Sequence, residues 1–188
     1  MILRLWLVRH GSTDWSEAGR LTGWTDVPLN DRGRAQARGL AQVLGQQSFI
    51  GAWSSDLIRA VETAQLASVD AVLDPRLREV DFGQLEGVRW DEIPSPTREA
   101  LREFDGFQAP GGESVAGLRQ RVAQFTHGLG EGDHVLFTHG GVIRALLRQA
   151  GQDRWVGPCA VARLTVNSLP GSAVRGDERR FEMRGELG

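Results

Sequence analysis

Apolar segments that alternate with helical patterns predict an α/β fold, with a mostly parallel sheet covered by helices on both faces. Two segments, residues 2–8 and 134–138, are rich enough in apolar residues to be strands buried on both faces. The 188 residues, 40% of them hydrophobic, can bury a core without metals or disulfides. We therefore expect one domain over residues 1–188, built as a three-layer sandwich.

The first half of the chain is expected to contain three strands separated by two helices. The predicted segments are strand 2–8, helix 30–47, strand 48–53, a helix that begins near residue 57, and strand 69–73. Asn30 or Asp31 is placed to cap the first helix, and the polar run 54–56 to cap the second. The expected apolar faces comprise Ala37, Leu40, Ala41 and Leu44 in the first helix, and Leu57, Val61, Ala64 and Leu66 in the second.

The second half begins with an irregular stretch, residues 75–112, which contains several prolines and glycines. We expect a short helix near 97–104 within it, and a variable lid or substrate loop over about 86–110. Further predicted segments are a helix from 115 to about 129, strand 134–138, helix 142–150 and strand 160–166. The polar tail, 170–188, is compatible with an edge strand or with disorder.

Composition excludes several classes of protein. A net charge of −2 argues against a nucleic-acid surface, which needs an excess of Lys and Arg. The lone Cys159 cannot form an internal disulfide, and we expect a small buried or half-buried thiol. The apolar start is too short for a signal peptide, and no later segment is long and apolar enough to cross a membrane. A cytoplasmic protein is the expectation, and a homodimer remains open.

Two His-Gly pairs carry most of the functional information. His10-Gly11 and His139-Gly140 each follow a predicted buried strand, and α/β sheets bind ligands at the carboxyl ends of their strands. Glycine also lets the backbone approach a ligand closely. Arg9 lies beside one of these histidines, and the planar guanidinium of arginine matches phosphate oxygens. A shared site for a phosphorylated ligand is therefore expected.

An ordered set of motifs resembles the histidine phosphatase (phosphoglycerate-mutase-like) superfamily over roughly residues 2–150. The matching segments are Leu7-Val8-Arg9-His10-Gly11, Leu21-Thr22-Gly23-Trp24, Ser54-Ser55-Asp56-Leu57 with Arg59, Leu77-Arg78-Glu79, Pro110-Gly111-Gly112-Glu113-Ser114 and Thr138-His139-Gly140-Gly141. The resemblance implies a phosphoglycerate-mutase-like fold and a small phosphomonoester as substrate. It implies no cofactor and no metal, and two nearby arginines would repel a cation.

The resemblance also implies a role for each matching residue. His10 corresponds to the nucleophile that becomes phosphorylated, and Glu79 to the general acid and base. Arg9, Arg59 and His139 correspond to the phosphate clamp, in which His139 would be protonated beside a dianionic phosphate. Further expected phosphate or substrate contacts are Gly11, Ser16, Thr22, Gly23 and Gly140.

Three functions remain open. A phosphatase is favoured because the chain is short for a cofactor-dependent phosphoglycerate mutase, and because residues 78–87 look like the acid motif of small bacterial phosphatases. Within the phosphatases the chain is similar to α-ribazole phosphatases and to broad-specificity phosphatases. A phosphoglycerate mutase is the alternative, and a non-catalytic phospho-ligand binder is disfavoured because every catalytic position is present.

The leaving group is not determined by the motifs. Trp90, Phe104 and Phe107 could form apolar walls for an aromatic or bulky substrate, or could pack the excursion onto the core. Trp24 is expected to be a buried structural residue. His127 and His134 match no family position and are expected to be ordinary helix-end or turn residues.

Overall fold

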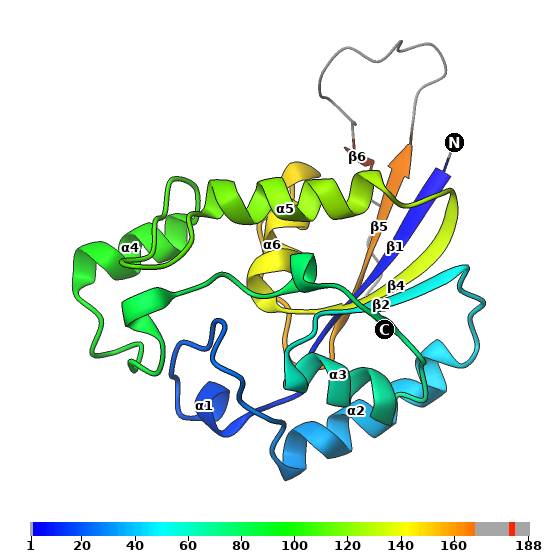
Figure 1. The fold of residues 1–188 in the computed structure, drawn as a ribbon, viewed down its shortest axis with the longest axis horizontal. Coiled ribbons are helices and arrows are strands. Elements are labelled where there is room, and N and C mark those ends of the chain that lie inside the picture. Colours follow the sequence, from blue (N-terminus) through cyan, green and yellow to red (C-terminus); the bar gives the residue numbers. More distant parts are fainter. Residues whose placement is uncertain (1, 168–180, 183–188) are drawn as a thin grey trace.

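The computed structural model describes residues 2–167 and 181–182, which form a six-stranded mixed sheet with helices on both faces (Figure 1). The strand order is β3-β2-β4-β1-β5-β6. The strands are β1 (Ile2–Arg9), β2 (Gly51–Ser54), β3 (Val72–Leu73), β4 (Gly132–Thr138), β5 (Val161–Asn167) and β6 (Phe181–Glu182). β1 to β4 are mutually parallel, and β5 runs antiparallel to both β1 and β6. The predicted α/β class with a mostly parallel sheet is confirmed.

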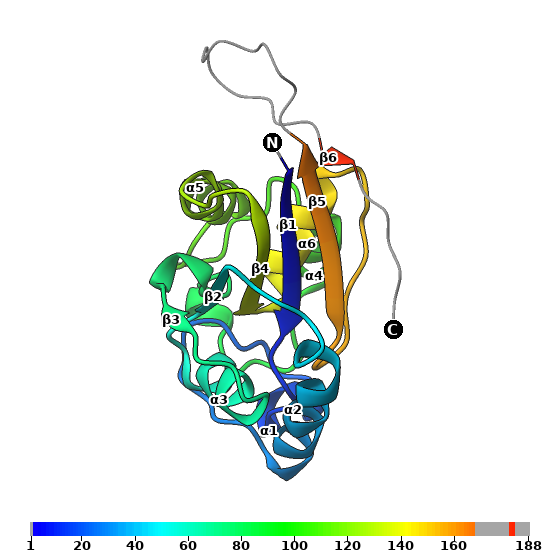
Figure 2. The same ribbon diagram turned by 90° about the vertical axis from the view of Figure 1, so that its right-hand side faces the viewer.

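The helices separate into two layers (Figure 2). The α-helices are α1 (Asp14–Glu17), α2 (Asp31–Leu44), α3 (Ile58–Leu66), α4 (Ser95–Glu103), α5 (Val115–His127) and α6 (Gly140–Gln149). The 3-10 turns are η1 (Pro75–Leu77) and η2 (Gly83–Leu85). α2 and α3 cover one face of the sheet, while α5 and α6 cover the other.

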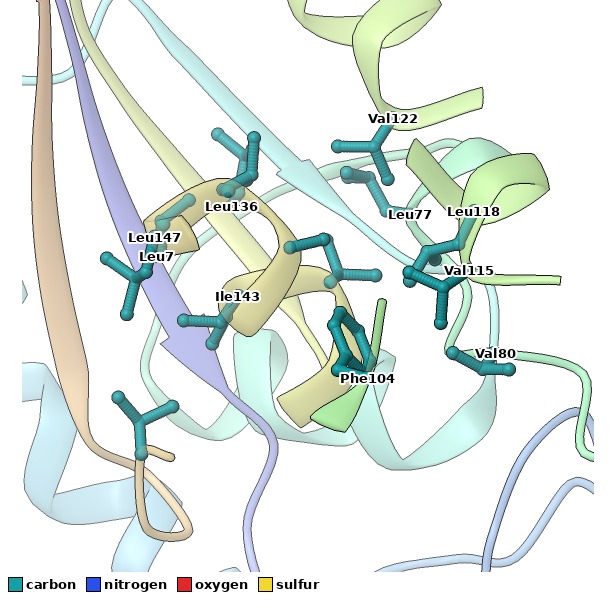
Figure 3. Packing of buried hydrophobic residues seen from close by; sticks show 14 of the residues in the cluster. Leu7, Leu77, Val80, Phe104, Val115, Leu118, Val122, Leu136, Ile143 and Leu147 are labelled. Atoms are coloured by element: carbon teal, nitrogen blue, oxygen red, sulfur yellow. The ribbon is translucent and has the colours of Figure 1, made fainter. Parts of the chain in front are cut away.

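Alternating side chains of β1 enter two separate apolar clusters. Leu5 and Leu7 join the larger cluster under α5 and α6, part of which Figure 3 shows. Trp6 and Val8 join the smaller cluster under α2 and α3. Both sides of a central parallel strand are thus removed from water, which explains the unbroken apolar run in its sequence.

Most predicted elements begin or end a few residues from their expected bounds, and two of the differences concern the sheet edge and the start of α3. The strand expected at 69–73 is reduced to Val72 and Leu73, both exposed, because it forms the sheet edge. The helix that we expected residues 54–56 to cap begins at Ile58. Its N-cap residue is Leu57, whose side chain makes no capping hydrogen bond, so the predicted cap is wrong.

The face expected to be apolar in α3 is also different. Its buried residues are Arg59, Ala60, Thr63 and Ala64, whereas Val61 and Leu66 are only half-buried. The arginine and the threonine are drawn inward because both form hydrogen bonds with neighbouring loops or with each other.

Two single-residue expectations need correction. His134 lies inside β4 rather than in a turn, where Trp53 donates to its Nδ1 at 3.3 Å. Trp24 is not buried: 40% of its surface is exposed, and its Nε1 donates to the Glu79 carbonyl at 2.9 Å.

The tail expected at 170–188 falls mainly outside the described residues, apart from β6, which pairs with β5. No helix in the described ranges is both long and apolar enough to cross a membrane.

Candidate active site

The two predicted histidines meet at the carboxyl edge of the sheet. His10 follows β1 and His139 follows β4, which are neighbouring parallel strands. The His10 amide donates to the Thr138 carbonyl at 3.0 Å, so the parallel pairing of the two segments continues to the end of the strands. The two ring centroids are 5.1 Å apart, and both rings are buried. The juxtaposition follows from parallel pairing, because parallel strands end at the same edge.

A single hydrogen bond fixes the proton on neutral His10. Its Nδ1 lies 2.7 Å from the Gly11 carbonyl oxygen, which can only accept. Nδ1 therefore carries the hydrogen, and Nε2 keeps its lone pair. Burial lowers the pKa of His10 well below its usual value, and the charges of Arg59 and Arg9 lower it further. At neutral pH the side chain is a neutral imidazole whose Nε2 lone pair is free.

Ser55 orients His139. Its hydroxyl lies 2.8 Å from His139 Nε2 and also accepts from the Leu57 amide at 3.3 Å. When Ser55 donates to Nε2, the hydrogen of neutral His139 resides on Nδ1, which is buried and has no partner among the described residues. Burial lowers the pKa of His139 well below normal, with Arg59 and His10 adding to the effect. Without an anion the ring is therefore neutral, and its buried Nδ1 has no hydrogen-bond partner among the described residues.

Arg59, which is buried, and Arg9, which is half-buried, bring positive charge to the same place. Arg59 donates to the carbonyls of Gly23 and Thr25 at 2.6 and 3.1 Å, and Arg9 donates to that of Val156 at 2.6 Å. In both residues Nε is buried and unpartnered within the described ranges. Burial lowers the pKa of Arg59 to about 10, so it stays charged at neutral pH. Unused donors and uncompensated cations together create a pocket suited to an anion.

Glu79 completes the site from an irregular segment after η1. Its side chain is 7% exposed and accepts hydrogen bonds from the Val80 amide at 2.9 Å and the Gly141 amide at 3.0 Å. A Cβ at Gly141 would lie 2.2 Å from Glu79 Oε1, so a larger residue there would displace the carboxylate. The carboxylate therefore sits against the first turn of α6, next to His139.

An ion pair that we did not predict holds the backbone of this segment. Arg121 of α5 binds both carboxylate oxygens of Glu113 at 2.8 Å. It also donates to the carbonyls of Arg76, Arg78 and Glu79 at 2.6–2.8 Å. Glu113 belongs to a recognised motif, but no local pattern distinguishes Arg121 from other arginines of its helix.

The loop before α2 contributes backbone rather than the predicted hydroxyls. Ser16 exchanges hydrogen bonds with Thr13 in a capping box of α1, and the Thr22 hydroxyl donates to the Arg20 carbonyl at 3.3 Å. The Gly23 carbonyl instead anchors Arg59. Glu86 holds this loop by accepting from the amides of Trp24 and Thr25 at 2.7 Å, a contact that sequence reasoning missed.

Two of the three predicted glycines, Gly11 and Gly140, lie beside the histidines and Arg9. The Gly11 amide donates to the Thr63 hydroxyl at 3.1 Å, so this amide is already engaged. Gly140 begins α6, and a Cβ there would be 3.6 Å from Arg9 Nε and 3.0 Å from the Trp155 ring. Cys159 is half-buried, as expected, and burial raises its thiol pKa to about 11. Within residues 2–167 and 181–182, no three His, Cys, Asp or Glu side chains are grouped to hold a metal.

Comparison with known proteins identifies the family of this chain. The model of the histidine phosphatase superfamily (branch 1) matches residues 5–168. Phosphoglycerate mutase-like protein 4 of Arabidopsis thaliana is 36% identical over 159 residues, covering 77% of this chain and 69% of that protein. A metal-independent phosphoserine phosphatase of Arabidopsis thaliana is 33% identical over 178 residues, covering 87% and 75%. The crystal structure of a phosphoglycerate mutase from Thermus thermophilus superposes with a TM-score of 0.81 at 46% identity, covering 99% of this chain and 100% of that one.

Proposed function

Because the chain belongs to branch 1 of the histidine phosphatase superfamily, we propose that it hydrolyses a small phosphomonoester through a phosphohistidine on His10. The observation that carries this proposal is the hydrogen bond from His10 Nδ1 to the Gly11 carbonyl. It leaves the Nε2 lone pair free in a buried site surrounded by unsatisfied cationic donors.

In the first step, Nε2 of His10 attacks phosphorus and an N–P bond forms as the P–O bond to the alcohol breaks. Glu79, in its protonated form, gives its proton to the departing alkoxide. Splitting one displacement into two makes each barrier lower than that of direct attack by water. A proton donor of this kind contributes roughly 10² to 10⁴ in rate.

Arg9, Arg59 and His139 stabilise the transferring group. Their free donors require no rearrangement before they meet the charge that develops on the phosphoryl oxygens, and preorganisation of this kind is a large source of catalysis. A bound dianion also raises the proton affinity of His139, so that its ring can become a cation during the reaction.

In the second step, Glu79 accepts a proton from water, whose oxygen forms the new P–O bond as the N–P bond breaks. His10 returns to its neutral form, and its Nδ1–H still donates to the Gly11 carbonyl. Inorganic phosphate then leaves, and no metal ion takes part in the sequence of steps.

Phosphoglycerate mutase is the second candidate, because a solved structure 46% identical to this chain carries that title. The chemistry would be the same up to phosphohistidine, and the phosphoryl group would then return to a bound phosphoglycerate instead of to water. The resemblance of residues 78–87 to small phosphatases favours hydrolysis.

Phosphate release from a panel of phosphomonoesters tests the proposal. Wild type and His10→Ala are compared in the presence of a chelator, with p-nitrophenyl phosphate, phosphoserine, 3-phosphoglycerate and α-ribazole phosphate as substrates. We expect chelator-resistant release by wild type, loss of turnover in His10→Ala, and an acid-labile phosphoenzyme on quenching. His127→Ala, which removes an exposed histidine at the end of α5, is the matched control.

Two other outcomes would contradict the proposal. Interconversion of 2- and 3-phosphoglycerate with a bisphosphate primer, without release of phosphate, would establish the mutase. Turnover that survives His10→Ala would exclude the phosphohistidine route altogether.

A further inference from the structure

A cavity of about 490 Å³ adjoins the candidate active site. It is lined by Leu21, Phe82, Trp90, Leu101, Arg102, Phe104, Gly141 and Trp155. Gly141 belongs to both places, because its amide binds the Glu79 carboxylate while the residue forms part of the cavity wall. The cavity therefore opens beside the group proposed to protonate the leaving alcohol. Its size falls within the range of pockets that enclose small molecules.

The cavity lining is almost entirely apolar. Among the described residues that form it, Arg102 alone is charged, and that residue lies at an exposed position at the end of α4. A leaving group that carries a carboxylate, such as glycerate or serine, would lose its water there and find a partner only at Arg102. Desolvation without full compensation is unfavourable, so such a group matches the cavity poorly.

The aromatic walls are fixed before any ligand arrives. The Arg144 guanidinium lies 4.8 Å from the Phe104 ring centroid and 5.0 Å from that of Trp155. Asp153 binds Arg144 at 2.7 Å and so ties the loop that carries Trp155 to α6. Arg102 stacks over Trp90 in the same way, at 5.5 Å. Walls held in place reduce the conformational entropy lost on binding.

Phe107, by contrast, is a packing residue. It is buried in the larger apolar cluster, where it lies against Phe82, and is not part of the cavity wall. Of the three aromatic residues considered from the sequence, Trp90 and Phe104 line the cavity.

We propose, as an extension of the phosphatase function, that this cavity binds the leaving group and selects phosphomonoesters whose alcohol carries a flat apolar or aromatic ring. Trp155 is the specificity-determining residue. Its ring is 58% exposed and would contact a Cβ at Gly140, so it stands between the phosphate site and the cavity. A ring placed there would be covered by indole on one side and by the Phe104 and Leu101 wall on the other.

The test compares two substrates with similar leaving-group reactivity, 2-naphthylmethyl phosphate and ethyl phosphate. Both release a primary alkoxide, so a difference in kcat/KM reports on binding of the ring. We expect wild type to prefer the naphthyl ester at least roughly tenfold, the discrimination that an apolar pocket commonly supplies. Calorimetry with the non-hydrolysable naphthylmethylphosphonate and methylphosphonate measures the same preference without turnover.

Trp155 variants identify the wall responsible. Trp155→Ala should reduce the naphthyl-to-ethyl ratio by roughly tenfold, and Trp155→Phe should restore most of it. Val43→Ala truncates a half-exposed apolar side chain on α2 and should leave the ratio at its wild-type value.

The two proposals fail in distinguishable ways. Equal use of both esters, or faster hydrolysis of 3-phosphoglycerate or phosphoserine than of the naphthyl ester, would overturn the cavity assignment while leaving the phosphatase intact. Selective, Trp155-dependent binding of the naphthyl phosphonate without hydrolysis of any ester would uphold the cavity and refute the phosphatase.

Discussion

Neutral histidines in a buried, positively charged site make stability depend on pH. The pKa values of His10 and His139 are lowered in the folded chain, so the unfolded chain binds more protons below about pH 6.5. The contribution of these histidines to the free energy of unfolding is therefore greatest above that pH, and the free energy of unfolding decreases as the pH falls below it. Each histidine contributes a slope of up to about 1.4 kcal/mol per pH unit. His134, whose pKa burial also lowers, acts in the same direction.

His10→Asn should weaken this dependence by removing one of the buried rings. Urea denaturation between pH 7.5 and 5.5, without phosphate, measures the slope in wild type and variant. His127→Asn, on an exposed ring, provides the comparison and should follow wild type. A slope in His10→Asn equal to that of wild type would mean that folding does not lower the pKa of His10.

At the scale of elements, distant contacts that follow from strand pairing were predictable, and those made by single side chains were not. The apolar runs of β1 and β4 indicated strands buried on both faces, and parallel pairing then brought His10 and His139 together. Arg121 could not be identified, since its targets lie 8 to 45 residues away and no periodicity marks it. The apolar period of α3 was misleading because Arg59 replaces an apolar residue on the buried face.

The start of α2 is built on a backbone contact that only glycine permits. A Cβ on Gly33 would lie 2.1 Å from the Ser12 carbonyl oxygen, in the loop that follows the nucleophile. Gly39 lies on the exposed side of the same helix, where a Cβ would meet nothing within 4 Å. The two positions therefore separate helix propensity from packing.

Gly33→Ala should destabilise the fold by roughly 2 kcal/mol or more and lower activity, because overpacking displaces the loop. Gly39→Ala should stabilise it by about 0.5–1 kcal/mol with activity unchanged. Urea denaturation and phosphate release measure both effects. Equal stability changes in the two variants would show that the Ser12 contact is not a constraint.

The Arg121–Glu113 pair connects α5 to the Glu79 segment. Arg121→Met would remove the hydrogen-bond donor of three backbone carbonyls and the cation that pairs with Glu113. The side chains of Arg121 and Glu113 are only 15% and 16% exposed, so water replaces these contacts poorly. We expect a loss of about 2 kcal/mol in the free energy of unfolding. We also expect a larger decrease in kcat/KM for alkyl phosphates than for p-nitrophenyl phosphate, because a poor alkyl leaving group depends most on the acid.

Arg119→Met is the matched control on the same helix. Arg119 pairs with Asp105 at the surface, with side chains 32% and 53% exposed, and its removal should change stability by about 0.5 kcal/mol or less. A normal kcat/KM for alkyl phosphates in Arg121→Met would show that the ion pair supports the fold but does not position Glu79.

At the scale of the whole molecule, a chain with a net charge of −2 concentrates buried positive charge at one site. Arg59 is fully buried and bonded to two carbonyls, and the carboxylates of Glu79, Asp26 and Glu86 act on it only through space. Burial of a cation without a contacting anion costs stability, and the lowered pKa of Arg59 reports that cost. The fold thus carries an unfavourable local charge that bound phosphate would relieve.

Arg59→Met should therefore make the ligand-free protein more stable, by about 2 kcal/mol, while abolishing its response to phosphate. Wild type should gain about 2.7 kcal/mol when inorganic phosphate is present at 100 times its Kd, and the gain should be insensitive to chelator. Urea denaturation with and without phosphate measures all four states. A ligand-free Arg59→Met less stable than wild type would mean that the two carbonyl hydrogen bonds outweigh desolvation. A phosphate response that persisted in this variant would place the anion elsewhere. The expected pair of results would show that the charge which binds substrate lowers the stability of the ligand-free fold.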